Sequence, residues 1–234
     1  MDQSSVEQAS KDPVTSREQD AVRILLLIDG ACEPPAAVEL ASPGLESAVG
    51  VVRTQVKLQK LDFWLRNPDY LANELLNDYE DSRDEQRLRW ASEILDSEQP
   101  EVRRYPMLRH HFGAYEWLDD ALAVLRSAEL IARRRRGTVN RIRQHDYFLL
   151  ERGRHVAREI VSQAPAFDYY VQRVKLVLLL ASGQSGSELK TRQYQQPEYA
   201  EAALRTRIAA VSTHARARLA TLRQEMAEQG TGEA

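Results

Sequence analysis

The chain has 234 residues, of which 43% are apolar and 29% charged, and its formal net charge is −3. This length accommodates one large domain or two small ones with a buried core. The single cysteine, Cys32, excludes a disulfide framework and a cysteine zinc cluster. No apolar run approaches the roughly 20 residues that span a bilayer, and the first residues lack the basic start and apolar stretch of a signal peptide. We therefore expect a cytoplasmic protein.

The charged residues are unevenly distributed along the chain. Residues 1–100 contain 10 Lys and Arg against 20 Asp and Glu, whereas residues 101–234 contain 22 against 15. Nearly all the cations of the second part are Arg, whose planar fork matches carboxylate and phosphate groups. The asymmetry favours two modules with different partners, although an ordinary solvated surface gives the same totals.

The first part of the chain is predicted to be a short polar lead followed by a helical module. Residues 1–15 contain too little apolar material to fold, so we expect a disordered lead. Residues 16–98 form the helical module, in which no strand signal stands out and the Pro-rich stretch 33–44 is expected to be a loop. The expected helices begin at Ser16, near Val49, at Asn67-Pro68 and near Ser82, and the first of them ends at Gly30.

The second module, residues 105–163, changes pattern in an informative order. A helical stretch ends near Ser127, a short apolar pair follows, and then comes a basic segment with one Gly. The aromatic and aliphatic residues 147–150 come next, and a new helix opens at 151. This order is typical of the recognition helix and wing of a winged helix–turn–helix. The sequence thus predicts a mainly α protein with a small β-hairpin wing; a plain helical bundle with an Arg-rich loop is the alternative.

The C-terminal region, residues 167–234, is expected to be helical. An apolar helix covers 167–180, a short one covers 188–195, and Pro197 precedes a long last helix of about 29 residues, roughly 43 Å in length. Such a helix either packs across both modules or pairs with another chain, which would give a homodimer. The apolar stripe along it supplies the candidate partner-binding residues, which are Leu204, Ile208, Val211, Leu219 and Leu222.

No constellation of residues predicts an enzyme. The chain lacks a phosphate-binding loop, a dinucleotide fingerprint, a nucleophile elbow and a helical zinc motif, so we expect no catalytic residue, cofactor or metal. His110 and His111 are adjacent and lack the spacing of a helical metal site. Cys32 lies beside an acidic residue, which disfavours a nucleophilic thiolate. The acidic run between Asp78 and Glu85 is interpreted as a solvated helix start.

The basic segment of the second module is the strongest local signal. On a wing, its arginines would meet phosphates of nucleic acid; an acidic protein surface is the alternative partner. The acidic residues in the preceding helix argue against base-specific reading, because base edges are read mainly by Arg, Asn and Gln. The candidate DNA-binding residues are Arg133, Arg134, Arg135, Arg136, Arg141, Arg143, Arg152 and Arg154.

Four segments of the chain resemble one protein family, in the family's order. They are Lys57–Leu71 (KLQKLDFWLRNPDYL), 111–120 (HFGAYEWLDD), 147–154 (YFLLERGR) and 185–190 (SGSELK, followed by Tyr194 and Pro197). They resemble the middle component of bacterial ABC three-component systems and the similar small third subunit of Lamassu-type SMC defence systems. The similarity runs from residue 57 to about residue 200, and the sequence departs from the family pattern at Leu150, where Thr is usual.

The resemblance implies a non-catalytic adaptor without catalytic residues of its own. Its implied partners are an SMC-like ATPase subunit and an effector nuclease, in bacterial defence against phage or plasmids. Together with the basic wing, this gives the expectation of an accessory subunit of an SMC-like ATPase complex that contacts DNA non-specifically. The alternative is a stand-alone winged-helix transcription regulator that dimerises through the last helix.

Overall fold

The computed structural model describes residues 16–97, 109–110, 113–114, 118–138, 141–204, 206 and 208–231. Its helices are α1 (Arg17–Ala31), α2 (Ala37–Leu40), α3 (Gln55–Arg66), α4 (Pro68–Ser82), α5 (Glu85–Asp96), α6 (Leu118–Ser127), α7 (Glu151–Gln163), α8 (Asp168–Leu180), α9 (Gly186–Tyr194), α10 (Pro197–Ala200) and α11 (Ser212–Thr231), with a 3₁₀ turn at Pro165–Phe167. Its strands are β1 (Ala48–Val52), β2 (Arg109–His110), β3 (Gly113–Ala114), β4 (Ile131–Thr138) and β5 (Arg141–Leu150). The expected lead 1–15 and the expected junction at 98–105 lie outside the described residues.

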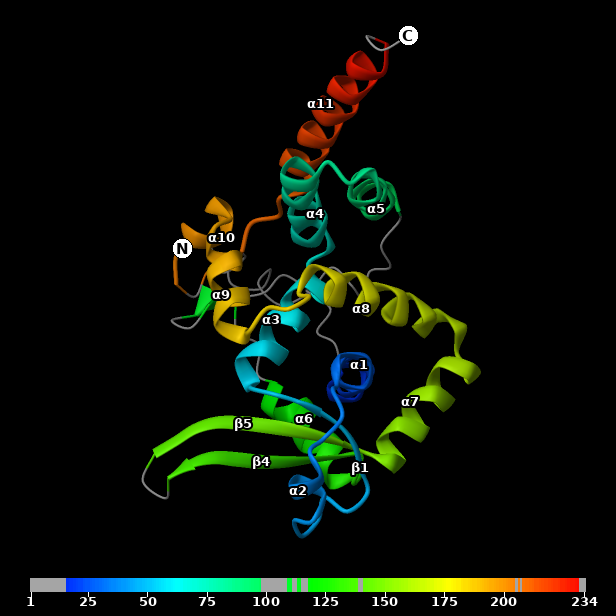
Figure 1. Ribbon diagram of the computed structural model, residues 1–234, viewed down its shortest axis with the longest axis vertical. Helices are drawn as coiled ribbons and strands as arrows, with labels where there is room; N and C mark the ends of the chain where they lie inside the picture. Colours follow the sequence, from blue (N-terminus) through cyan, green and yellow to red (C-terminus); the bar gives the residue numbers. More distant parts are fainter. Residues whose placement is uncertain are drawn as a thin grey trace, which may run out of the picture.

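The protein is mainly helical with a small amount of sheet, as expected, and the sheet has three antiparallel strands rather than the two of a hairpin. The sheet lies at one end of the molecule and α4, α5 and α11 at the other, with α1, α3 and α8 between them (Figure 1). A two-stranded ribbon of β2 and β3 is separate. Within the described residues, no helix has both the length and the apolar character needed to cross a membrane.

The sheet corrects the prediction that the first part of the chain has no strand. Its order is β1-β5-β4, so β1 pairs with β5, and Val51 lies opposite Phe148. Five residues carry too short a pattern to stand out by themselves, and the partner strand comes much later in the sequence. The basic segment, predicted from the sequence to be the link between two short strands, is itself largely strand. Its arginine run 133–136 lies within β4, because pairing with β5 continues from Ile131 opposite Leu149 to Thr138 opposite Arg141.

Each face of the sheet is covered by apolar side chains, as the two-residue period of a strand requires. Tyr147 and Leu149 belong to the main hydrophobic core on the helical side. Phe148 points the other way and packs with Leu45 and Val51 in a small second cluster beside α2. This alternation anchors the hairpin base on both sides and leaves its tip to extend away from the helices (Figure 1).

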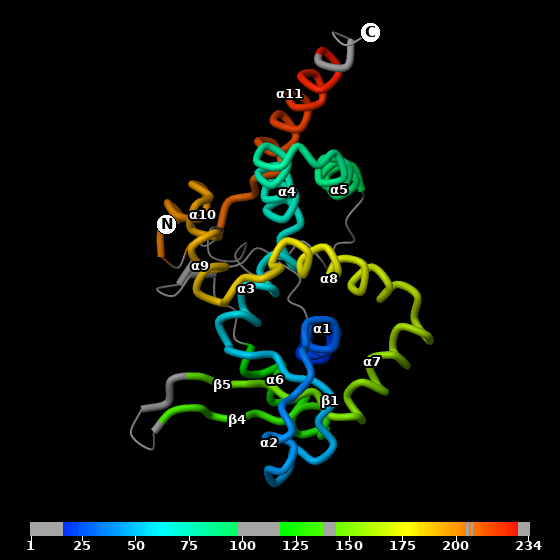
Figure 2. Tube along the Cα trace, in the orientation of Figure 1, coloured from blue at the N-terminus to red at the C-terminus, as the bar shows by residue number. Residues whose placement is uncertain are grey.

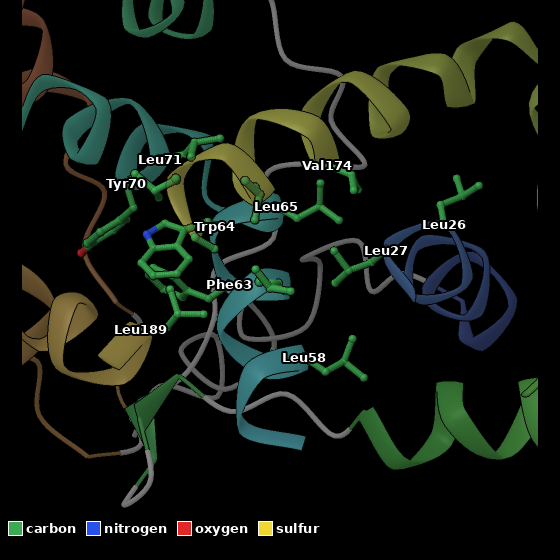
Figure 3. Close-up of a cluster of buried hydrophobic side chains, with 14 of the residues drawn as sticks. Leu26, Leu27, Leu58, Phe63, Trp64, Leu65, Tyr70, Leu71, Val174 and Leu189 are labelled. Carbon is green, nitrogen blue, oxygen red and sulfur yellow. The ribbon is translucent and has the colours of Figure 1, made fainter. Parts of the chain in front are cut away.

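The centre of the main core is α3, which is buried around most of its circumference. Its residues Leu58, Phe63, Trp64 and Leu65 are almost fully inaccessible to solvent. The side chains that surround them come from α1, α4, α8 and α9; those labelled in Figure 3 are Leu26, Leu27, Tyr70, Leu71, Val174 and Leu189. The core continues to residues of α6, β5 and α11. Each of the three expected folded regions therefore contributes to one core.

Helix α1 begins as predicted and continues past its expected end. Ser16 and Gln19 form a reciprocal capping box, in which the backbone N–H of Gln19 donates to the Ser16 hydroxyl over 3.2 Å. The helix continues through Gly30 to Ala31 instead of stopping at the glycine. A Cβ atom on Gly30 would lie 2.6 Å from Cγ1 of Val174. The glycine thus serves the close approach of α1 and α8 rather than a helix stop.

The single long C-terminal helix predicted after Pro197 is wrong. Helix α10 ends at Ala200, and α11 begins only at Ser212. Side chains of α4 bind the intervening backbone: the Tyr70 hydroxyl donates to the carbonyl of Ala209 over 2.8 Å, and the Val211 N–H donates to Asp69 Oδ2 over 2.7 Å. These bonds replace the hydrogen bonds of a continuous helix. Helix α11 then contacts α4 and α5 and extends past them towards the C-terminus (Figure 2).

Candidate nucleic-acid interface

The arginine run of the basic segment lies on β4 and is divided between the two faces of the hairpin. Arg133 is opposite Tyr147 and Arg135 is opposite His145, on the side of the helical core. Arg134 and Arg136, which alternate with them along the strand, therefore point to the side of α2. The sequence shows four consecutive arginines, whereas the sheet presents two pairs that face opposite directions.

Three of these arginines form no ion pair with any carboxylate that the structure describes. Arg133 and Arg134 are half-buried and Arg135 is exposed. In the part of the chain that the structure describes, no ion pair reaches any of the three. The pKa of the neighbouring His145 is lowered, first by burial and then by the positive charges of Arg133 and Arg135. Uncompensated positive charge is what an anionic ligand requires of its binding surface.

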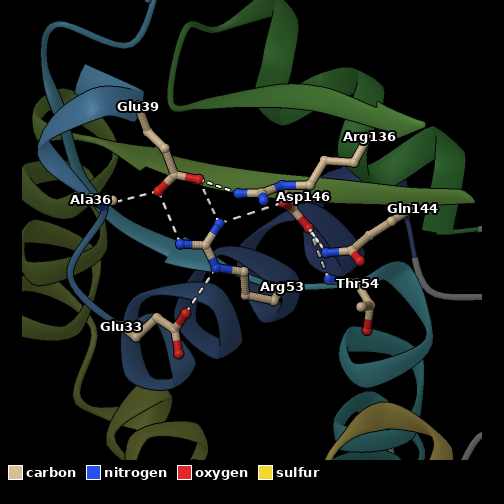
Figure 4. Close-up of polar contacts among 8 residues, drawn as sticks. All are labelled: Glu33, Ala36, Glu39, Arg53, Thr54, Arg136, Gln144 and Asp146. Carbon is tan, nitrogen blue, oxygen red and sulfur yellow. Dashed lines mark hydrogen bonds and ion pairs between the residues drawn. The ribbon is translucent and has the colours of Figure 1, made fainter. Parts of the chain in front are cut away.

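Arg136 differs from the other three because it is held by acidic groups of the same chain. Its Nε donates to Asp146 Oδ2 over 2.6 Å, and its Nη2 donates to the carboxylate of Glu39 on α2. Asp146 has 0% of its side chain exposed. It also accepts hydrogen bonds from the side chain of Gln144 and, over 3.2 Å, from the backbone N–H of Thr54 (Figure 4).

A second arginine, Arg53, joins the same network from the end of β1. Its Nη1 and Nη2 donate to the two oxygens of Glu39 over 2.6 and 2.9 Å, and its Nε donates to Glu33 over 2.8 Å (Figure 4). The fork of Arg53 is the main reason that the pKa of Glu39 is lowered to about 2, with the N–H of Ala36 and the charge of Arg136 adding to the effect. The two arginines and three carboxylates tie the α2 segment to the sheet.

The junction between β1 and α3 carries backbone strain beside this network. Thr54 has a φ of 67°, a left-handed value that a β-branched residue rarely adopts. Its hydroxyl caps α3 by accepting from the N–H of Lys57 over 3.1 Å, while its own N–H binds Asp146. These two bonds hold a conformation that costs of order 1–3 kcal/mol when left unsupported.

Of the four remaining predicted DNA-binding arginines, only Arg152 and Arg154 have side chains that the structure describes, and both lie on α7 rather than on the hairpin. The side chains of Arg141 and Arg143, on β5 near the hairpin tip, lie outside the described residues. Arg152 and Arg154 are on α7, beyond the far end of β5, about 30 Å from the tip at roughly 3.3 Å per residue. Arg152 is exposed, and one of its nitrogens lies 3.9 Å from Glu129.

Arg154 is held by contacts with side chains of the same chain. Its Nε donates to Asp29 Oδ1 over 3.1 Å, and its Nη2 contacts the sulfur of Cys32 at 3.2 Å. Burial is the largest cause of the raised pKa of Cys32, and the nearby Arg154 charge opposes it. This environment fits the expectation that Cys32 serves packing rather than nucleophilic chemistry.

Most of the predicted partner-binding stripe is covered by the chain itself. Ile208, Val211, Leu219 and Leu222 belong to the main hydrophobic core. They lie on α11 and the segment before it, which contact α4 and α5. Leu204 is the exception, with 47% of its surface exposed. The stripe thus packs within its own chain, on α4 and α5 of the first module, and pairing with another chain stays a prediction.

Within the described residues, no group of three His, Cys, Asp or Glu side chains could hold a metal ion; His111 and the side chain of His110 fall outside that part of the chain. The acidic run that begins at Asp78 is partly compensated by arginines. Arg192 binds Asp78 and Glu74, while Arg218 binds Glu80.

Sequence reasoning missed the network around Asp146 and Glu39. An acidic residue within a basic hairpin is a usable signal, since opposite charges pair across strands. However, the residue directly opposite Asp146 is Arg134, whereas the arginine that binds it is Arg136. The part played by Glu39 and Arg53 depends on the position of α2 against the sheet, which no local pattern encodes.

Comparisons with protein-family models, curated proteins and solved structures found no match to this chain.

Proposed function

We propose that the chain is a non-catalytic accessory subunit that contacts the phosphate backbone of duplex DNA through the β4–β5 hairpin. The observation that carries this proposal is the set of three arginines on one strand, Arg133, Arg134 and Arg135, without a carboxylate partner among the described residues. Desolvating such a concentration of like charge is unfavourable unless an anion accompanies it. A nucleic-acid backbone supplies anions in a regular row.

The arrangement of elements supports a winged helix–turn–helix as the finer description of this region. Helix α1, strand β1 and helix α3 precede α6 and the β4–β5 hairpin, and β1 completes the sheet next to β5. Helix α6 contacts α1 and leads directly into β4. In this assignment α6 takes the place of the recognition helix, the hairpin is the wing, and α4 and α5 are an insertion between α3 and α6.

The exposed face of α6 favours contact with phosphates over reading of bases. Asp119 and Asp120 are exposed in the first turn of the helix, at the end that would approach the major groove. Carboxylates there would be repelled by the DNA backbone. The proposed contact is therefore non-specific and strongly dependent on salt.

The partners of the proposed subunit follow from the resemblance to the middle components of ABC three-component and Lamassu-type systems. They are an SMC-like ATPase and an effector nuclease, in defence against phage or plasmids. The alternative, a stand-alone regulator, needs a base-reading helix and a dimer interface. The acidic face of α6 and the burial of Ile208 and Val211 within the chain both favour the accessory subunit.

The test of DNA contact replaces Arg133, Arg134 and Arg135 together with Ala. At a slope of roughly 0.9 per phosphate, loss of three contacts should reduce the salt dependence of log K by about 2.7 and weaken binding at 0.1 M salt by about 500-fold. Binding of a fluorescent duplex of random sequence, titrated at several salt concentrations, measures both quantities. A circular dichroism melt establishes that the variant is folded.

A matched control removes the same total charge elsewhere. Arg89, Lys175 and Lys190 are exposed on α5, α8 and α9, and their triple replacement with Ala should leave the salt slope close to that of the wild type. Equal losses in the two triple variants would refute the hairpin as the contact. Stoichiometric co-purification with an SMC-like ATPase from the source cells tests the accessory role, whereas nanomolar binding of one operator in moderate salt would favour the regulator.

A further inference from the structure

Two arginines from different strands of the sheet region converge on one carboxylate. Arg53 follows β1 and places both terminal nitrogens on Glu39, and Arg136 on β4 approaches the same carboxylate from the hairpin (Figure 4). The side chain of Glu39 is 11% exposed, whereas that of Arg136 is 52% exposed. The guanidinium of Arg136 thus lies at the surface, on the same face of the hairpin as Arg134.

The arrangement around Glu39 has the geometry of an oxyanion site. A guanidinium fork binds two oxygens of one planar or tetrahedral anion, and phosphate oxygens fit that fork as well as carboxylate oxygens do. Asp146, fully buried behind the pair, binds Arg136 through Nε and lies 3.5 Å from Nη1 of Arg53. It therefore fixes both arginines whether or not Glu39 is present.

Apart from the ion pairs of Glu39, helix α2 has few contacts that anchor it. Helix α2 has only four residues, none of them buried, and Val38 in its middle has 77% of its surface exposed. Pro34, Pro35 and Pro43 flank it. Its displacement would uncover little apolar surface, so it is a low-cost movement compared with any movement of the hairpin.

We propose that Arg53 and Arg136 form a phosphate site for the DNA backbone, and that Glu39 occupies this site when DNA is absent. The proposal rests on the proposed DNA contact and adds its regulation: the α2 segment competes with DNA for two arginines of the interface. Because the same chain supplies the competitor, DNA gains these contacts only by displacing the carboxylate. Binding is thereby weaker than the arginine content of the region implies.

The test is Glu39→Gln in the full-length protein, measured with the same random-sequence duplex. Release of one or two arginines should steepen the salt slope by about 0.9 to 1.8 and tighten binding at 0.1 M salt by about 8-fold to 60-fold. Glu46→Gln is the matched control, since Glu46 is an exposed carboxylate on the same segment between α2 and β1. This control should bind DNA as the wild type does, apart from a small effect of net charge.

A double variant tests whether the gain in DNA affinity depends on Arg136. In a protein that already carries Arg136→Ala, the effect of Glu39→Gln should fall by about 8-fold, because one of the two released cations is missing. If Glu39→Gln does not fold, Glu39→Asp withdraws the carboxylate by one methylene and should give a smaller gain in the same direction.

Equal affinity and slope for Glu39→Gln and Glu46→Gln would overturn the inference and leave the proposed function intact, provided that the Arg133, Arg134 and Arg135 triple variant still loses DNA. If neither the wild type nor Glu39→Gln retains the duplex at low salt, the proposed function fails and the inference fails with it.

Discussion

Replacing Asp146 with Ala should destabilise the protein by about 3 kcal/mol. Removing one partner of a buried ion pair costs about 3–5 kcal/mol, and the lower end applies here because Arg136 is half exposed and can regain water. The change also leaves the N–H of Thr54 without its acceptor, at the residue whose φ is 67°. At about 2–4 °C per kcal/mol for a chain of this size, the melting temperature should fall by about 6–12 °C.

Urea unfolding followed by circular dichroism measures this loss, and two further variants interpret it. Asp146→Asn keeps an acceptor oxygen for Thr54 and loses the charge and the acceptor for Arg136 Nε, so its cost should be smaller than that of Asp146→Ala, about 1–2 kcal/mol. Arg134→Ala removes the cross-strand neighbour of Asp146, with which it forms no ion pair in the described part of the chain, and should change stability by less than about 0.5 kcal/mol. If Asp146→Ala and Arg134→Ala prove equally stable, the network does not support the hairpin.

Three other outcomes test the fold and the ion pairs of Glu39. Gly153→Ala should cost about 1–2 kcal/mol despite better helix propensity, because its Cβ would lie 2.1 Å from the carbonyl oxygen of Leu130; a gain in urea midpoint would contradict this close approach. Ile208→Asp should lower the melting temperature sharply, since Ile208 is 7% exposed; an altered oligomeric size with an unchanged melt would assign this residue to assembly instead. The pKa of Glu39 is lowered from 4.5 to about 2, so its carboxylate stabilises the fold fully above pH 4.5 and this contribution is lost as the pH falls through 2. The stability difference between wild type and Glu39→Gln should therefore shrink on acidification, and a difference independent of pH would refute the ion pair.

Much of the helical architecture could be predicted from local patterns. The capping residue Ser16, the proline at the start of α4 and the helix opened at Glu151 all agree with the structure. These signals succeed because caps and proline act within one helical turn. The aromatic and aliphatic residues at 147–150 likewise predicted β5, because their side chains serve both faces of a strand.

The failures concern contacts between distant segments. The break after α10 depends on Asp69 and Tyr70, which are far from the segment whose backbone they bind. The division of the arginines between two faces depends on the register of β4 with β5, and a shift of one residue would exchange the faces. That Arg136 is the β4 arginine bound by Glu39 depends further on where α2 lies. Composition alone therefore marked the basic segment along the chain and could not say which of its cations are held by carboxylates of the same chain.

The position of β1 in the sheet has a consequence for synthesis of the protein. Thr54 and its acceptor Asp146 are 92 residues apart, and a ribosome that adds about 5–20 residues per second makes Asp146 about 5–20 s after Thr54. During that interval the β1 strand has an open edge and the strained turn after it has no anchor. The N-terminal part of the nascent polypeptide therefore stays incompletely folded until the hairpin leaves the exit tunnel. During this time a chaperone or an assembly partner would have most influence on the yield of folded protein.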